Sequence, residues 1–147
     1  MAAPSSADPP PALWNPIAAA RWSLLFSPAF GAYLHACNAD TLGRAEEAKA
    51  HRIWFYVALV FLGLDMLGAL MPVIPDNFFL MGSLVLLFAW YVSLGRKQIR
   101  YVKDTWQDRY QRKSWTTPLL IGVAGWVAFS LIDSILAFHA LSMLNVS

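Results

Sequence analysis

The chain has 147 residues, of which 58% are hydrophobic and 14% are charged, and its formal net charge is +2. Soluble domains carry about 25% charged residues, and a chain of this length cannot hide so many apolar side chains in a water-soluble core. This composition excludes a nucleic-acid-binding module, a disordered regulator and a typical soluble enzyme. It predicts a small integral membrane protein of the all-α class.

The first segment, residues 1–12, is rich in proline and small polar residues. Such a segment buries too little apolar surface to become ordered, so we predict a disordered leader. No lysine or arginine precedes Arg21, which does not fit the basic start of a cleavable signal peptide.

Residues 13–52 are predicted to form short cytoplasmic interfacial helices. Asn15 and Ser27 each precede a proline, and a capping residue followed by proline is typical of a helix start. These two starts predict helices over residues 17–26 and 29–37.

Both of these helices are too short to cross a bilayer, and Arg21 and His35 would be costly in lipid. We therefore expect amphipathic helices that are in-plane or re-entrant and packed under the bundle. A single kinked fourth span is the competing interpretation. A break near Gly43 is expected to separate them from a polar helix that leads into the first span.

Residues 53–147 are predicted to form a bundle of three transmembrane helices. Three runs approach or exceed the ~17 to 25 residues that a helix needs to cross a bilayer. These runs cover about residues 53–71, 78–94 and 118–141.

The connector at residues 96–117 carries seven basic and two acidic residues. Ile99, Val102, Trp106 and Tyr110 recur in it at helical spacing, which predicts a basic amphipathic helix that continues the second span. Such a helix is suited to rest on the anionic inner leaflet and to fix the topology. A partner or nucleotide site is the alternative interpretation.

All 11 basic residues fall on one side of the predicted membrane. Four precede the first span and seven lie in the connector, whereas the turn at residues 72–77 and the tail after residue 141 have none. The positive-inside rule then places the N-terminus and the connector in the cytoplasm and the C-terminus outside.

Two ionisable residues, Asp65 and Asp133, lie inside spans. At 1.5 Å per residue they stand about 18 Å and about 22 Å from the cytoplasmic ends of their helices. Ser83 on the antiparallel second span falls in the same layer. Three interpretations stay open: a hydrogen-bonded structural cluster with Ser83, Ser130 or Ser134, a cation or proton site, or docking of a partner's transmembrane segment.

Other chemistry is not indicated. Cys37 is the only cysteine, so no disulfide forms within the chain. His35, Cys37 and His51 are too few to predict a metal site. The chain has no phosphate-binding glycine loop and no nucleophile motif, so we expect neither an enzyme nor a cofactor.

A string near the N-terminus, LWNPIAAARWSLLFSPAFGAYLHACNADTLG, resembles a family of short multi-pass inner-membrane proteins of proteobacteria that carry a W-N-P-x-A-A-x-x-W-S-L-L-F-x-P-A-F-G-A motif. The resemblance covers roughly residues 13–56. At Ala39 the chain departs from the family, in which a tryptophan follows the position of Asn38. The matching positions are Trp14, Asn15, Pro16, Ala18, Ala19, Trp22, Ser23, Leu24, Leu25, Phe26, Pro28, Ala29, Phe30, Gly31 and Ala32.

Some members of this family resemble immunity proteins to membrane-targeting toxins of type VI secretion and interbacterial competition. The resemblance implies a multi-pass protein of the bacterial inner membrane that neutralises a pore-forming or membrane-inserting toxin by binding it in the bilayer. The expected partners are the lipid bilayer, a cognate toxin or a second copy, and no nucleic acid. The alternative function is a small membrane subunit or transporter component that moves ions or protons through Asp65 and Asp133.

Small residues suited to close helix approach would form the contact face, although most of them are expected to pack within the bundle itself. They are Gly63, Gly68, Gly82, Gly122, Gly125 and Ala128.

Overall fold

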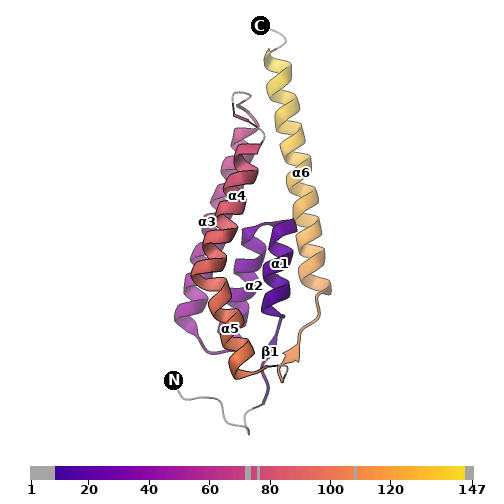
Figure 1. Ribbon diagram of the computed structural model, residues 1–147. Helices are drawn as coiled ribbons and strands as arrows, with labels where there is room; N and C mark the ends of the chain where they lie inside the picture. Colours follow the sequence, from indigo (N-terminus) through magenta and orange to yellow (C-terminus); the bar gives the residue numbers. More distant parts are fainter. Residues whose placement is uncertain (1–8, 72–73, 76, 108, 145–147) are drawn as a thin grey trace.

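The computed structural model describes residues 9–71, 74–75, 77–107 and 109–144, and these residues are mostly helical (Figure 1). The predicted all-α class is therefore confirmed, apart from one short strand pair. In chain order the elements are β1 (Ala12–Leu13), α1 (Pro16–Phe26), α2 (Pro28–Thr41), α3 (Ala45–Gly68), α4 (Asn77–Trp90), the π-helical turn η1 (Tyr91–Gly95), α5 (Arg96–Thr105), β2 (Gln111–Arg112) and α6 (Thr116–Leu144).

Three of the described helices are long and apolar enough to cross a membrane: Ala45–Gly68, Asn77–Thr105 and Thr116–Met143. They contain the three predicted spans almost entirely. The first begins earlier than predicted because the polar helix after Gly43 runs without a break into the span. The second is longer because α5 continues α4 through η1, as the amphipathic pattern of the connector indicates.

Helices α1 and α2 form an antiparallel hairpin that stands beside the long helices, between α3 and α6 (Figure 1). They lie neither under the bundle nor in one line as a kinked fourth span, because the chain reverses at Ser27. The start of α1 is capped as predicted, since Asn15 Oδ1 accepts hydrogen bonds from the amides of Ile17 at 3.0 Å and Ala18 at 3.2 Å.

The hairpin packs upright because α2 presents buried alanines to its neighbours, and small side chains allow helices to approach closely. Ala32, Ala36 and Ala39 are all buried on α2. Ala39, where the motif that the sequence resembles has a tryptophan, is thus a packing position on α2.

The end of the molecule that holds α5 and the two strands, here called the basic end, is closed by the N-terminal segment. β1 pairs in parallel with β2, and the Gln111 amide donates to the Pro11 carbonyl at 2.9 Å. The predicted disordered leader is therefore too long, because residues 11–12 join this pair; residues 1–8 lie outside the described residues.

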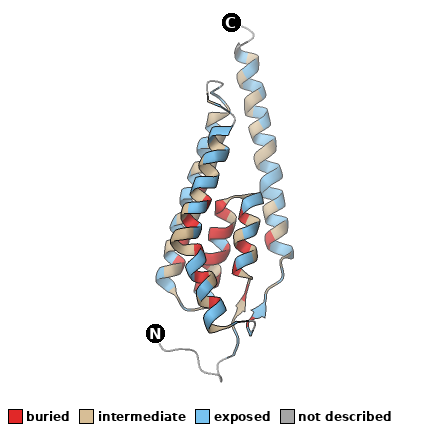
Figure 2. Ribbon diagram, viewed as in Figure 1, coloured by how far each residue is buried: buried red, intermediate tan, exposed pale blue. Residues whose placement is uncertain are grey.

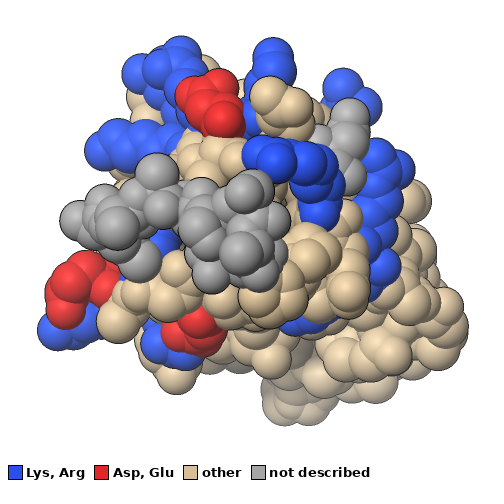
Figure 3. All heavy atoms as spheres, turned by 90° about the horizontal axis from the view of Figure 1, so that it is seen from below, with Lys and Arg blue, Asp and Glu red and all other residues tan. Residues whose placement is uncertain are grey.

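The apolar face predicted for the connector is found only in part, because α5 ends at Thr105, before Tyr110, and Ile99 lies on the outside of the molecule. The other predicted residues meet at this closure. Val102 and Tyr110 are buried with Leu13, and Trp106 packs against them. These side chains therefore contact the N-terminal segment, while the charged residues of α5 face outward. Seen from below, Lys and Arg side chains gather on this end of the molecule (Figure 3).

Burial is confined to the half of the molecule near the basic end (Figure 2). Among the described side chains, none is buried in residues 59–71 of α3 and its C-terminal turn, 77–86 of α4 or 119–143 of α6. Large apolar side chains are exposed along all three stretches. Such a surface is unfavourable in water and suits the hydrocarbon of a bilayer.

Candidate functional site: an acidic layer beside an open helix face

The predicted acidic residues stand on helices α3 and α6, and both side chains are half-buried. Helices α3 and α6 contact each other. The residue count along each helix predicts that the two aspartates lie at a similar level. Two carboxyl groups at one depth repel each other when both are charged, so the pair is suited to hold a proton or to meet a donor from outside the chain.

Ser83 is half-buried on α4, but the structure gives it no hydrogen bond to either aspartate among the residues it describes. Of the two serines near Asp133, Ser134 donates its hydroxyl proton to the carbonyl of Ser130 at 2.7 Å and so bonds its own helix. The hydroxyl groups predicted to satisfy the carboxyls therefore do not do so here.

The inner face of α6 carries Gly122, Gly125, Phe129 and Asp133 at spacings of three and four residues, so these residues share one side of the helix. Near its base this face is covered, since a side chain at Gly122 would lie 3.0 Å from the ring of Phe26. Higher up it is open: no atom lies within 4 Å of a side chain built at Gly125.

The other small residues divide into two groups. Gly68 and Gly82 lie directly beneath the rings of Phe79 and Phe61, so they serve the contact between α3 and α4. Gly63 has open space around it, as Gly125 does, and Ala128 is exposed. Only this second group is free to meet another molecule.

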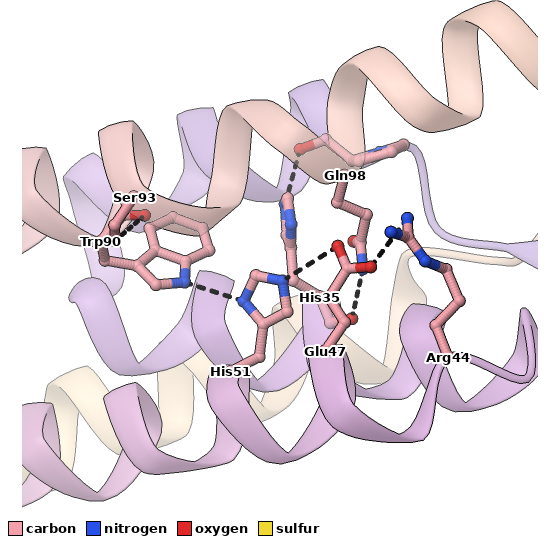
Figure 4. Close-up of polar contacts among 8 residues, drawn as sticks. His35, Arg44, Glu47, His51, Trp90, Ser93 and Gln98 are labelled. Atoms are coloured by element: carbon pink, nitrogen blue, oxygen red, sulfur yellow. Dashed lines mark hydrogen bonds and ion pairs between the residues drawn. The ribbon is translucent and has the colours of Figure 1, made fainter.

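A buried polar cluster that the sequence did not predict joins α2, α3 and the α4–α5 helix near the basic end (Figure 4). His35, His51, Trp90 and Gln98 are its fully buried members. The indole Nε1 of Trp90 donates to His51 Nδ1 at 3.0 Å. Gln98 Nε2 donates to the carbonyl of His35 at 2.9 Å, and the two histidine rings are 5.2 Å apart.

These contacts fix the protonation of both histidines. His35 Nε2 lies 3.0 Å from the carbonyl of Pro16, which can only accept, so this nitrogen carries the proton. His51 accepts at Nδ1 and therefore carries its proton on Nε2. Burial, with a smaller effect of His51, lowers the pKa of His35 to about 3, so the ring is neutral at neutral pH.

The cluster is incompletely satisfied. His35 Nδ1, His51 Nε2 and Gln98 Oε1 have no hydrogen-bond partner among the described residues. Glu47 Oε1 stands 3.9 Å from His51 Nε2, and the other oxygen of Glu47 pairs with Arg44 at 2.7 Å. The described ranges contain no group of three or more His, Cys, Asp or Glu side chains that could hold a metal. The hydrogen bonds from Trp90 to His51 and from Gln98 to His35 join different helices and so hold α2, α3 and the α4–α5 helix in register.

Comparison with family models, with curated proteins and with solved structures finds no match for this chain. The resemblance over residues 13–56 thus stays a prediction. In the structure, the residues of this motif form the α1–α2 hairpin and pack around Trp90. None of them belongs to the acidic layer, the name used here for Asp65, Ser83 and Asp133.

Proposed function

We propose that the chain is a multi-pass protein of the bacterial inner membrane that binds a partner helix within the bilayer, and that this partner is a pore-forming or membrane-inserting interbacterial toxin. The observation that carries the proposal is the open space at Gly125, on the side of α6 that also bears the half-buried Phe129 and Asp133. An exposed apolar helix face is unfavourable in water. In a bilayer the same face can bind another transmembrane helix.

The chemistry of this face favours a helix over lipid tails. A glycine lets two helix backbones approach closely, which strengthens their van der Waals contact and permits hydrogen bonds between them. Asp65 and Asp133 have no cation at their depth, because residues 53–95 and 114–138 contain no Lys, Arg or His. A hydroxyl or a cationic group on the incoming helix would satisfy them.

Binding of this kind would protect a cell without turnover. A toxin helix held against α6 cannot pack with its own copies or with the rest of the toxin, and the pore does not assemble. The link to immunity comes from the family resemblance, and the link to helix binding comes from the open face; the two are independent.

A protection assay tests the proposal. A strain that lacks the chain is challenged by a competitor that secretes the toxin encoded beside it, and survival is compared for the wild type and single variants. A Cβ atom at Gly125 meets no atom of the described chain within 4 Å, so we expect Gly125→Leu to insert normally and, by filling this space, to lose protection. Asp65→Asn and Asp133→Asn are expected to weaken protection.

Matched controls keep the result specific. Val127→Leu changes the outer surface of the same helix, and Asp104→Asn removes a carboxylate from exposed α5; both are expected to protect like the wild type. If loss of the chain never sensitises cells to the neighbouring toxin, the immunity proposal is wrong.

The second candidate function is movement of ions or protons, which the placement of Asp65 and Asp133 within two of the three long apolar helices favours. Three spans do not enclose a pathway, so this function would require an oligomer. Purified protein in liposomes that contain a pH-sensitive dye would then carry protons, and Asp65→Asn would abolish the flux. The immunity proposal predicts no flux for either protein.

A further inference from the structure

A groove on the outside of the molecule lies between α1, the end of α4 with η1, and α5, and its volume is about 540 Å³. Leu24 comes from α1, Leu84, Leu87 and Phe88 from α4, and Ile99 from α5. This size and lining are typical of a site for a small amphiphilic molecule, because ligand sites of ~300 to 1,000 Å³ are mostly apolar with a few placed polar groups.

The polar side chains of the groove belong to Arg21 and Tyr91. Arg21 is exposed and makes no ion pair with any residue in the described ranges. No carboxylate is among the residues that line the groove. An arginine held on an apolar wall without a counter-ion favours an anionic ligand, and its planar guanidinium is suited to a phosphate.

Helical spacing places two more cations at the rim of the groove. Arg96 and Lys103 lie three residues before and four residues after Ile99 on α5, so they share its side of the helix, and both are exposed. The upper wall, by contrast, is formed by Leu84 and Phe88, which belong to the apolar second span. Along α1, Arg21 lies one turn nearer the basic end than Leu24, and along α5, Lys103 lies one turn nearer the basic end than Ile99. Leu84 and Phe88 thus form the wall toward the middle of the span, and these two cations lie toward the basic end.

We propose that this groove binds one anionic phospholipid of the leaflet at the basic end. Its phosphate contacts Arg21 with Arg96 and Lys103 at the rim, and one acyl chain lies along the wall of Leu84, Leu87 and Phe88. The polarity of the groove matches the orientation that a lipid already has in that leaflet. A free nucleotide would leave the apolar wall in water, and an apolar partner helix would leave Arg21 unpaired.

Native mass spectrometry of the full chain in detergent tests this proposal, with phosphatidylglycerol and phosphatidylcholine added separately at equal concentrations. We expect phosphatidylglycerol to be retained in preference to phosphatidylcholine. The double variant Arg21→Gln/Arg96→Gln is expected to lower phosphatidylglycerol binding by about tenfold or more, because charge-assisted hydrogen bonds are lost. The control Lys97→Gln/Arg109→Gln removes the same charge outside the groove and is expected to bind like the wild type.

Ala20→Trp supplies a second test that leaves every charge in place, since Ala20 lines the groove and a large ring there fills it. We expect this variant to keep its helical circular dichroism and to lose the lipid. Equal binding of the two lipids, equal loss in both double variants, or full binding by Ala20→Trp would each overturn the proposal. None of these results depends on whether the chain neutralises a toxin.

Discussion

Trp90 joins the second long helix to the first through a single side-chain hydrogen bond. This bond shows how one buried polar atom can contribute to the stability of the fold. Its ring is fully buried and lies edge-on to His35 and His51. The indole N–H is the only donor that reaches His51 Nδ1 among the described residues. Removal of this donor would leave a buried nitrogen unsatisfied.

We expect Trp90→Phe to lower the free energy of unfolding by about 1–3 kcal/mol, the cost of a buried polar atom without its partner, beyond any loss of packing. Denaturant unfolding in detergent, followed by circular dichroism, measures the change. Trp126→Phe on exposed α6 makes the same chemical change outside the cluster and is expected to have little effect. Equal stability of the two variants would contradict the role given to the hydrogen bond.

The neutral state of His35 predicts how stability depends on pH. The unfolded ring titrates near its ordinary pKa of 6.5, whereas the folded ring has a pKa of about 3. Between these values the unfolded state binds a proton that the folded state does not, so the free energy of unfolding falls as the pH falls below 6.5, by up to about 1.4 kcal/mol per pH unit.

Thermal unfolding at pH 7.5, 6.0 and 4.5 measures this dependence. His35→Gln keeps a donor for the Pro16 carbonyl but cannot be protonated, so its midpoint should fall less on acidification than that of the wild type. His139→Gln changes an exposed histidine on α6 and should keep the wild-type slope. A slope unchanged in His35→Gln would show that other groups control the acid response.

The two sites differ in how far the sequence reveals them. Asp65 and Asp133 are visible at once, because a carboxylate in an apolar run is expensive and must have a reason. The cluster of His35, His51 and Gln98 is not visible in this way, because each residue stands in a segment of mixed polarity. Each of these polar residues lies on a helix face that becomes buried when the helices pack. The sequence alone does not reveal this face, because it depends on how α2 packs against α3.

At the scale of elements, the α1–α2 hairpin is held by a few close contacts. The side chain of Asn38 bonds both backbone groups of Trp14, accepting from its amide at 3.0 Å and donating to its carbonyl at 2.8 Å. Gly31 lies against Ser23 of α1 and against Trp90. Asn15 and Ser27, each followed by proline, predict where the helices begin, although the Ser27 side chain makes no capping hydrogen bond. The long-range contacts decide that the hairpin stands upright.

We expect Gly31→Ala to destabilise the fold by about 1–3 kcal/mol, because an added side chain overpacks a filled contact. The new carbon would overlap the hydroxyl of Ser23 and lie 2.9 Å from Trp90 Cη2. Gly125→Ala is the matched control, since nothing lies within 4 Å of that position. Denaturant unfolding of both variants makes the comparison.

A second-site change sharpens this test. The closest atom to the new side chain is the hydroxyl oxygen of Ser23, so Ser23→Ala in the Gly31→Ala background should recover part of the lost stability. If Gly31→Ala/Ser23→Ala recovers stability and Gly125→Ala does not change it, the loss of stability in Gly31→Ala comes from the contact with Ser23. No recovery would place the strain at Trp90 alone.

At the scale of the whole molecule, the chain is divided between a packed half near the basic end and three long helices that extend from it with their side chains exposed. The sequence predicts the three spans well, because length and apolar content decide them. It does not predict the β1–β2 pair or the packing of the N-terminal segment on α5. Two-residue strands carry no periodicity, and their pairing joins segments about 100 residues apart.

The β1–β2 pair has a consequence for topology that charge counting alone does not provide. Gln111 and Lys113 donate their amides to Pro11 and Leu13, and Trp14 Nε1 donates to the carbonyl of Ser114 at 2.9 Å. The N-terminal segment and the connector are therefore bound together and must lie on one side of any membrane that the three long helices cross.

Reporter fusions test this constraint and the charge rule together. Green fluorescent protein fluoresces when it folds in the cytoplasm, and alkaline phosphatase is active only outside it. We expect fluorescence from fusions at the N-terminus and within the connector after Gln107, and phosphatase activity from a fusion after Leu144. The reason is that all 11 Lys and Arg residues lie on the connector's side of the three long helices, the side that the positive-inside rule assigns to the cytoplasm. Opposite results at the N-terminus and the connector would contradict the strand pairing. Phosphatase activity at both would invert the molecule and move the lipid groove and the acidic layer to the other leaflets.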